Sequence, residues 1–239
     1  MGNSSKKFLI FACAPTGSLQ TSDYRCLYEE LGKKHRTKFT RSDMHHVGID
    51  ACVERDAEYI KTVGKIQTKY VLKDSDWEHF SAGYKKNTSL SKYIAAFETA
   101  YHKTLEARDA RESVRLNTTR ALERKTQVVV VSMSGAKEIQ RLMEDTPEYV
   151  KLAKTLGYSI GIFFPSVSFP RVIQRSRRRF QFPLQGDGPP RYAEYQDYKS
   201  TTRLVLQLQS EKWVDFSLKV DGVTENTSTC TGVTWWEKQ

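Results

Sequence analysis

Residues 8–18 read Phe8-Leu9-Ile10-Phe11-Ala12-Cys13-Ala14-Pro15-Thr16-Gly17-Ser18, an apolar run that ends in a turn. A short, uninterrupted apolar run bounded by turn residues is typical of a strand that is buried on both faces. Thr21 or Ser22 can then cap a helix that Gly32 ends, with apolar residues at three- and four-residue spacing between them. A strand, a tight turn and a helix in this order predict the start of a βαβ unit.

The same alternation continues along the chain. The β-branched run Gln127-Val128-Val129-Val130-Val131 is the clearest strand, and a helical stretch that stops at Gly157 separates it from the next one. We expect five strands, at residues 8–14, 38–40, 127–131, 159–164 and 213–220. Strands that alternate with helices predict an α/β fold, in which a mainly parallel five-strand sheet lies between helices.

A chain of 239 residues is long enough to bury one substantial core, so we expect a single domain that spans residues 1–239. Residues 51–92 combine one helical pattern with a stretch rich in turn residues, and we interpret them as an insertion. Apolar residues then recur at helical spacing over residues 93–122, which predicts either one long helix or two.

The chain carries a formal net charge of +10, which attracts phosphates, nucleic acid or an anionic membrane surface. Solubility is the alternative explanation for this charge. Much of the charge is concentrated in two clusters, which favours a binding site. The clusters contain Lys33, Lys34, His35, Arg36, Lys38 and Arg41, and Arg171, Arg175, Arg177, Arg178, Arg179 and Arg191.

The four cysteines form no Cys-x-x-Cys pair, which indicates neither a zinc site nor a disulfide scaffold and fits a reducing, cytoplasmic compartment. No run approaches the roughly 20 apolar residues of a membrane span. The opening Met1-Gly2 suggests N-myristoylation of Gly2, although Lys6 stands where that pattern requires Ser or Thr. One acyl chain there would attach the protein only reversibly to the periphery of a membrane.

The order of these parts resembles that of the polynucleotide kinase and zeta toxin branch of the P-loop kinases. Three soft motifs carry the resemblance: a helix and buried strand over residues 122–134, a helix end over residues 149–158, and a strand, turn and arginine-rich helix over residues 159–179. The resemblance implies a three-layer P-loop NTPase-like fold with a lid-like region at residues 170–200. It also implies ATP with Mg²⁺ as cofactors for phosphoryl transfer to a polynucleotide or nucleoside.

The phosphate-binding loop departs from that family's Gly-x-Pro-Gly-Ser-Gly-Lys-Ser-Thr, in which N–H groups surround the phosphates and the lysine bridges two of them. Leu19 or Gln20 stands where the lysine should be, and Arg25 is the cation that could substitute for it. Ser132-Met133-Ser134 replaces the family's Asp-Thr-Asn, which removes a carboxylate that helps to order magnesium. The positions to which the resemblance still assigns phosphate binding are Pro15, Thr16, Gly17, Ser18 and Thr21.

Two features of the family are retained. Asp43 follows the expected second strand, where polynucleotide kinases place the aspartate that accepts the proton of the substrate hydroxyl. A turn aspartate that caps a local N–H is the commoner alternative. Arg175, Arg178 and Arg179 match the lid whose guanidinium groups clamp nucleotide phosphates, and a solvated basic helix face is an equal alternative.

Two further groups of residues favour structural explanations. Tyr192, Tyr195 and Tyr198 recur every third residue, which fits packing against the core better than stacking on a strand of nucleic acid. The pair His45-His46 matches no zinc-ligand spacing, so we predict no metal site.

Three functions compete on this evidence. We rank first a degenerate P-loop kinase-like protein that binds nucleotide or nucleic acid through its basic surface without efficient phosphoryl transfer. The arginines that could neutralise a bound phosphate are retained. The loop lysine and the magnesium-ordering aspartate, which phosphoryl transfer requires, are not. The alternatives are an active, divergent polynucleotide or nucleoside kinase with Asp43 as its base, and a structural, matrix-like protein apposed to an anionic membrane surface.

Overall fold

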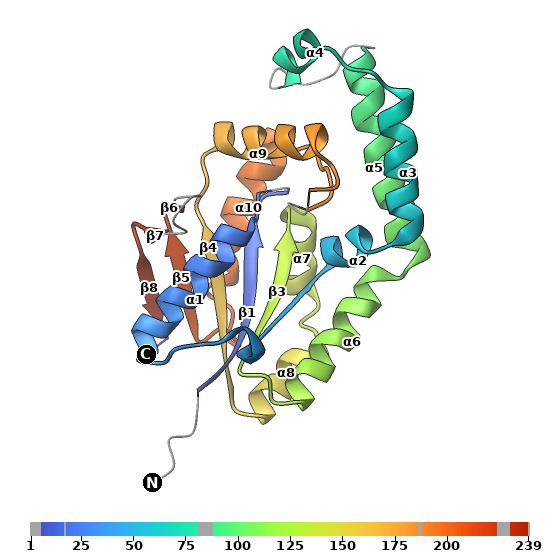
Figure 1. The fold of residues 1–239 in the computed structure, drawn as a ribbon. Coiled ribbons are helices and arrows are strands. Elements are labelled where there is room, and N and C mark those ends of the chain that lie inside the picture. Colours follow the sequence, from blue (N-terminus) through green and yellow to red (C-terminus); the bar gives the residue numbers. More distant parts are fainter. Residues whose placement is uncertain (1–5, 17, 81–87, 186–187, 224–229, 239) are drawn as a thin grey trace.

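A six-stranded sheet forms the centre of the computed structural model, which describes every residue except 1–5, 17, 81–87, 186–187, 224–229 and 239 (Figure 1). Its strand order is β2-β3-β1-β4-β5-β8, and all neighbours are parallel except β5 and β8. The strands are β1 (Lys7–Ala14), β2 (Met44–Gly48), β3 (Val128–Ser134), β4 (Tyr158–Pro165), β5 (Phe216–Val220) and β8 (Thr234–Glu237). Two short strands, β6 (Gly222–Val223) and β7 (Cys230–Thr231), pair separately.

Successive residues of the central strands pack on opposite faces of the sheet, because side chains alternate along a strand. Leu9 and Phe11 face one core, and Phe8 and Ile10 face the other. The first core is covered by α6 (Ala110–Glu123), α7 (Ala136–Glu144), α8 (Glu148–Thr155) and α10 (Tyr195–Leu208). The second is covered by α1 (Thr21–His35). These layers confirm the predicted α/β fold with a mainly parallel sheet between helices.

Two of the expected strands differ from the prediction. The count of five is wrong, because β8 adds an antiparallel sixth strand at the edge. The second strand is not at residues 38–40 but at Met44–Gly48, after a 3₁₀ turn, η1 (Arg41–Asp43). This edge strand exposes His45 and His46, so it lacks the apolar run by which the central strands are recognised.

A third hydrophobic core lies beside the sheet, in a group of helices formed largely by residues of the expected insertion. We call α3 (Ala57–Lys69), α4 (Asp74–Glu78) and α5 (Ser89–Ala107) the helical arm; α3 and α5 run side by side and α4 lies at its tip (Figure 1). The arm packs against α9 (Phe169–Gln181) through Tyr59, Phe97 and Phe180, while α2 (Ile49–Glu54) joins it to β2.

The helical pattern over residues 93–122 belongs to two helices, α5 and α6. They are separated at Asp109, whose φ of 42° is left-handed and cannot continue a helix. No helix among the described residues is long and apolar enough to cross a membrane.

A disulfide bond joins Cys26 of α1 to Cys230 of β7, with 5.5 Å between the Cα atoms. The cysteine spacing did not indicate this bond, and the argument from the cysteines for a reducing compartment loses its basis. The two cysteines are 204 residues apart in the chain, so no local spacing motif could indicate the bond. Cys13 and Cys52 are free.

Candidate functional site

A cleft of about 990 Å³ opens at the carboxyl ends of β1, β2 and β3. The connection after β1 leaves towards β2 on one side, whereas the connection after β3 crosses to β4 on the other side of β1. In open parallel sheets, such a reversal of strand order is where ligands bind. The cleft is lined by parts of several elements. These are the turn after β1, α1, the start of α2, α5, α6, the first turn of α7, the loop after α9 and the first turn of α10.

The turn after β1 is held by the protein's own side chains. The Ser18 backbone N–H and hydroxyl donate to the Pro15 carbonyl, at 3.1 and 2.7 Å. Thr16 donates from its hydroxyl and its N–H to one carboxylate oxygen of Asp197, at 2.9 and 3.4 Å. The other oxygen of Asp197 accepts from the Ala136 N–H at 2.9 Å. A carboxylate therefore stands where the resemblance expects phosphate oxygens.

Two arginines of α9 also bind this turn, through its carbonyl oxygens. Arg175 donates to the Ser18 carbonyl at 2.6 Å and lies 3.3 Å from the Asp23 carboxylate, and Arg179 donates to the Leu19 carbonyl at 2.5 Å. Both arginines are only 4% exposed. Burial raises the pKa of Asp23, and the positive charge of Arg175 opposes that shift.

These contacts fix α9 to the turn and give both buried arginines a structural role. Arg178 is on the same helix and is exposed. Phosphate binding by Arg175, Arg178 and Arg179 stays a prediction. Thr21 begins α1, while Gly17 and Gly2 lie outside the described residues, as does any acylation at Gly2.

Asp43 does not lie in the cleft, and its expected position after the second strand is corrected. It immediately precedes β2, at the amino end of the parallel strands, because Met44 pairs with Val128 and Gly48 pairs with Ser132. Its carboxylate accepts from the Thr40 N–H at 2.7 Å and the Thr40 hydroxyl at 2.5 Å. These hydrogen bonds lower the pKa of Asp43. Its surroundings are those of a turn cap.

Asp50 is the aspartate that follows the true second strand, and it lines the cleft. It accepts a 2.7 Å hydrogen bond from the Tyr101 hydroxyl of α5. The Arg191 guanidinium lies 4.1 Å from the centre of the Tyr101 ring and its Nε lies 3.5 Å from Glu98. Placing the second strand at residues 38–40 concealed Asp50; a strand ending at Gly48 would have pointed to it.

The pKa values around Asp50 are shifted. Burial and then the charge of Asp50 raise the pKa of both the Tyr101 hydroxyl and the Glu54 carboxyl. Burial opposes the charged form of Arg191, but Tyr101, Asp50 and Glu98 together leave its pKa raised. Asp50 therefore lies in a partly desolvated group of titratable side chains, which is a feature of ligand-binding and catalytic sites.

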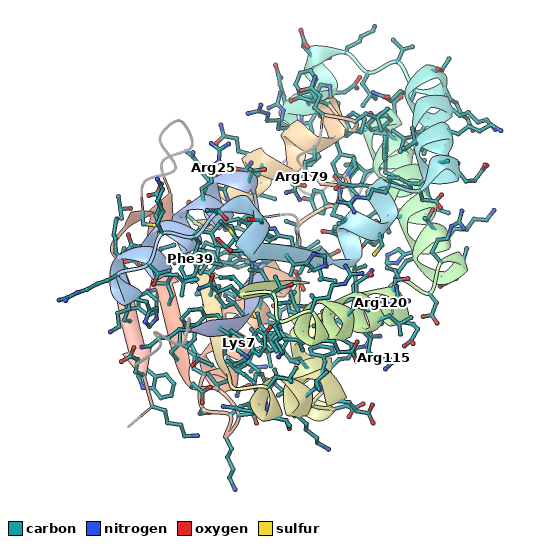
Figure 2. The ribbon with its side chains drawn as sticks, turned by 60° about the horizontal axis from the view of Figure 1, so that its bottom comes forward. Lys7, Arg25, Phe39, Arg115, Arg120 and Arg179 are labelled. Carbon is teal, nitrogen blue, oxygen red and sulfur yellow. A yellow bond between two sulfur atoms is a disulfide. The ribbon has the colours of Figure 1, made fainter. Side chains whose placement is uncertain are left out.

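Three cations line the cleft without a hydrogen bond or ion pair to any other described residue: Arg25, Arg55 and Lys137. Arg111 and Arg141 differ, because both pair with Glu138, at 3.0 and 2.7 Å. Arg25 of α1 and Arg179 of α9, both labelled in Figure 2, line this cleft. The unpaired cations give the cleft positive charge that is available to a ligand.

Aromatic and hydroxyl groups form the wall of the cleft between α1 and β2. The Tyr24 hydroxyl lies 2.6 Å from the Ser132 hydroxyl, and the Tyr28 hydroxyl contacts His46. Desolvation of the imidazole lowers the pKa of His46, which favours its neutral form. Among the described residues, no three His, Cys, Asp or Glu side chains gather in a way that could hold a metal ion.

Tyr192 and Tyr198 pack against the core of the helical arm, as the core explanation expects, whereas Tyr195 does not. The Tyr192 hydroxyl donates to the Phe80 carbonyl at 3.3 Å, and the rings of Tyr195 and Tyr198 lie 5.0 and 5.4 Å from the ring of Phe169. Tyr195 remains 52% exposed.

The residues present do not fit an ATP–Mg²⁺ complex held in the way the resemblance implies. That mode needs a cation at residue 19 or 20, whereas Leu19 packs on the apolar core beneath α1. It also needs N–H groups in the turn that can receive a phosphate, and the Asp197 carboxylate already accepts from Thr16. A second anion there would meet like-charge repulsion.

No protein-family model matches the chain, and no curated protein matches it significantly in sequence. Among the solved structures that match, one chain comes from the PezAT chromosomal toxin-antitoxin system of Streptococcus pneumoniae. It is 9% identical, the match covers 97% of this chain and 74% of that one, and the TM-score is 0.46. A likeness of this degree assigns neither a family nor an activity.

Proposed function

We propose that this chain is a P-loop kinase-like protein whose cleft binds a nucleotide or nucleic acid without efficient phosphoryl transfer. The observation that carries the proposal is the division of charges in the cleft. The groups at the turn after β1 are occupied by Asp197, Arg175 and Arg179, while the cleft cations Arg25, Arg55 and Lys137 make no hydrogen bond or ion pair with the described residues. Binding of a phosphate-bearing ligand needs these cations of the cleft. Phosphoryl transfer needs the groups at the turn, which are occupied.

The unpaired cations lie on separate elements around the cleft, which suits a ligand with more than one phosphate. Arg25 comes from α1, Arg55 follows α2 and Lys137 lies in the first turn of α7. Each cation that contacts a phosphate releases a counterion from nucleic acid, so binding of this kind weakens as salt is added. A nucleotide or the end of a nucleic acid presents such phosphates.

Replacing Arg25 and Lys137 together with alanine should weaken the binding of a fluorescent single-stranded RNA, because two phosphate contacts are lost. The slope of log affinity against log salt should also become shallower by about 1–2. Fluorescence anisotropy at several salt concentrations measures both effects.

The matched control is Lys61→Ala with Lys65→Ala, which removes the same charge from the exposed face of α3, outside the cleft. If both double variants lose affinity equally, the RNA is held by the average charge of the surface and the cleft is not its site. Calorimetry with ATP adds a second check. Tight, magnesium-dependent binding by the wild type would contradict a turn whose donors are occupied by Asp197.

Asp50 supports a second candidate, an active divergent polynucleotide or nucleoside kinase. Its carboxylate lies in the cleft after β2, the place where the resemblance puts the base, and Tyr101 fixes its orientation. On this candidate, the wild type transfers radiolabel from ATP to a 5′-hydroxyl oligonucleotide. Asp50→Asn should abolish the transfer and Asp43→Asn should leave it intact, because only Asp50 lines the cleft. Absence of transfer by the wild type would exclude this activity on that substrate.

A further inference from the structure

A carboxylate from the first turn of α10 bridges the segments that follow β1 and β3 at the carboxyl edge of the sheet. Asp197 is the third residue of α10. One of its oxygens accepts from the N–H and hydroxyl of Thr16, just beyond β1, and the other accepts from the N–H of Ala136, just beyond β3. The carboxylate thus connects the turn after β1 to the beginning of α7 and lies at the wall of the cleft.

These three donors form an arrangement that suits an anion. Ala136 is the first residue of α7, where the helix dipole favours negative charge. The N-cap residue of α7 is Gly135, which has no capping side chain, so Asp197 supplies that cap from another helix. Gly135 has a φ of 90°, and a Cβ there would lie 2.5 Å from the Thr16 hydroxyl and 3.3 Å from Asp197. Only glycine permits this close approach.

We propose that Asp197 makes an autoinhibitory contact: its carboxylate occupies an anion site formed by Thr16 and Ala136, and a phosphate group of the cleft ligand must displace it to bind there. This inference rests on the proposed function, and it identifies the group that competes with Asp197 as a terminal phosphate. Lys137, next to Ala136, lines the same cleft and lacks a partner among the described residues, so it would add to the attraction.

Displacing the carboxylate does not require α10 to leave the domain. Thr201, Val205 and Leu208 of α10 are completely buried, so the body of the helix is fixed. Asp197 is half-buried and precedes those residues in the first turn, so a change of its side-chain rotamer can release both oxygens. The contact is thus a local switch on a rigid helix.

The direct test is phosphate binding by Asp197→Ala. Removing the carboxylate abolishes both the competition and the like-charge repulsion, so inorganic phosphate should bind at least about tenfold more tightly than to the wild type. The same variant should prefer a 5′-phosphorylated RNA to its 5′-hydroxyl counterpart, and the wild type should not. Calorimetry measures the first effect and anisotropy the second.

The matched control is Glu194→Ala. It removes the same charge from the N-cap position of α10, but the Glu194 carboxylate makes no hydrogen bond or ion pair with the described residues. Its phosphate affinity should equal that of the wild type. A gain in both variants would show that only net charge matters and would overturn the proposal. Unchanged affinity in a folded Asp197→Ala variant would also overturn it.

Two measurements keep the proposal testable if Asp197→Ala does not fold. Asp197→Asn preserves the shape and one acceptor oxygen while removing the charge, and it should show an intermediate gain. In the wild type, titration with a large excess of phosphate should shift the amide resonances of Thr16 and Ala136 first. Shifts elsewhere but not at these two amides would overturn it. The RNA affinity of the wild type and its loss on changing Arg25 and Lys137 concern the proposed function alone, so the two ideas can fail separately.

Discussion

Replacing Arg175 with alanine should lower the free energy of unfolding by about 3–5 kcal/mol, because it leaves the Asp23 carboxylate buried without its counter-charge. Asp23 is 0% exposed, and besides Arg175 it accepts from the Gln20 N–H at 2.8 Å. The change also removes the hydrogen bond from Arg175 to the Ser18 carbonyl, which holds α9 against the turn. Urea denaturation of both proteins measures the difference.

The loss should depend on pH in a defined direction. The folded-state pKa of Asp23 is raised by burial above its ordinary value of 3.8, and removing Arg175 raises it further. Folding therefore favours the protonated form, so the deficit is largest above the raised pKa and shrinks as the pH falls towards 3.8. Arg177→Ala is the control, since Arg177 makes no hydrogen bond or ion pair with the described residues and should change stability by no more than about 0.5 kcal/mol. Equal effects of the two changes would contradict a buried ion pair.

Cys230→Ser should lower the free energy of unfolding by about 2–4 kcal/mol, because the bond from Cys26 to Cys230 restricts a large part of the unfolded chain. A reducing agent should lower the thermal midpoint of the wild type to that of the variant and should not affect the variant. Differential scanning calorimetry with and without reductant checks both statements.

Cys52→Ser is the matched control, because Cys52 is half-buried and free. It should change stability little, and its midpoint should still respond to reductant. Titration of the denatured, unreduced wild type should find only the two free thiols of Cys13 and Cys52. Four reactive thiols and a midpoint that ignores reductant would contradict the bond and would restore the case for a reducing compartment.

The central part of the fold was predictable because β1, β3 and β4 are buried on both faces and carry continuous apolar runs. β2 and β8 lie at the edges of the sheet, where one side of the strand need not be apolar. His45 and His46 conceal β2, and β8 at Thr234–Glu237 was not among the five expected strands. Edge strands therefore account for the errors in the sheet.

The candidate site was predictable in location but less so in its residues. Thr16, in the turn after β1, lies at the cleft, since a buried first strand followed by a turn and a helix places that turn at the carboxyl edge of the sheet. Asp197 and Tyr101 reach that edge from helices remote in sequence, and their contacts depend on how these helices pack. No spacing in a single sequence reports such a contact. The disulfide escaped prediction for the same reason.

The separate core of the helical arm has a consequence for the shape of this cleft. The wall that carries Tyr101 is supported by Tyr59, Phe97 and Phe180, none of which belongs to either core of the sheet. Substitutions of Tyr59 or Phe97 reshape one wall of the cleft, while the strands that lead to Thr16 and Ala136 are supported by the two cores of the sheet. The shape of the cleft and the stability of the sheet thus depend partly on different residues.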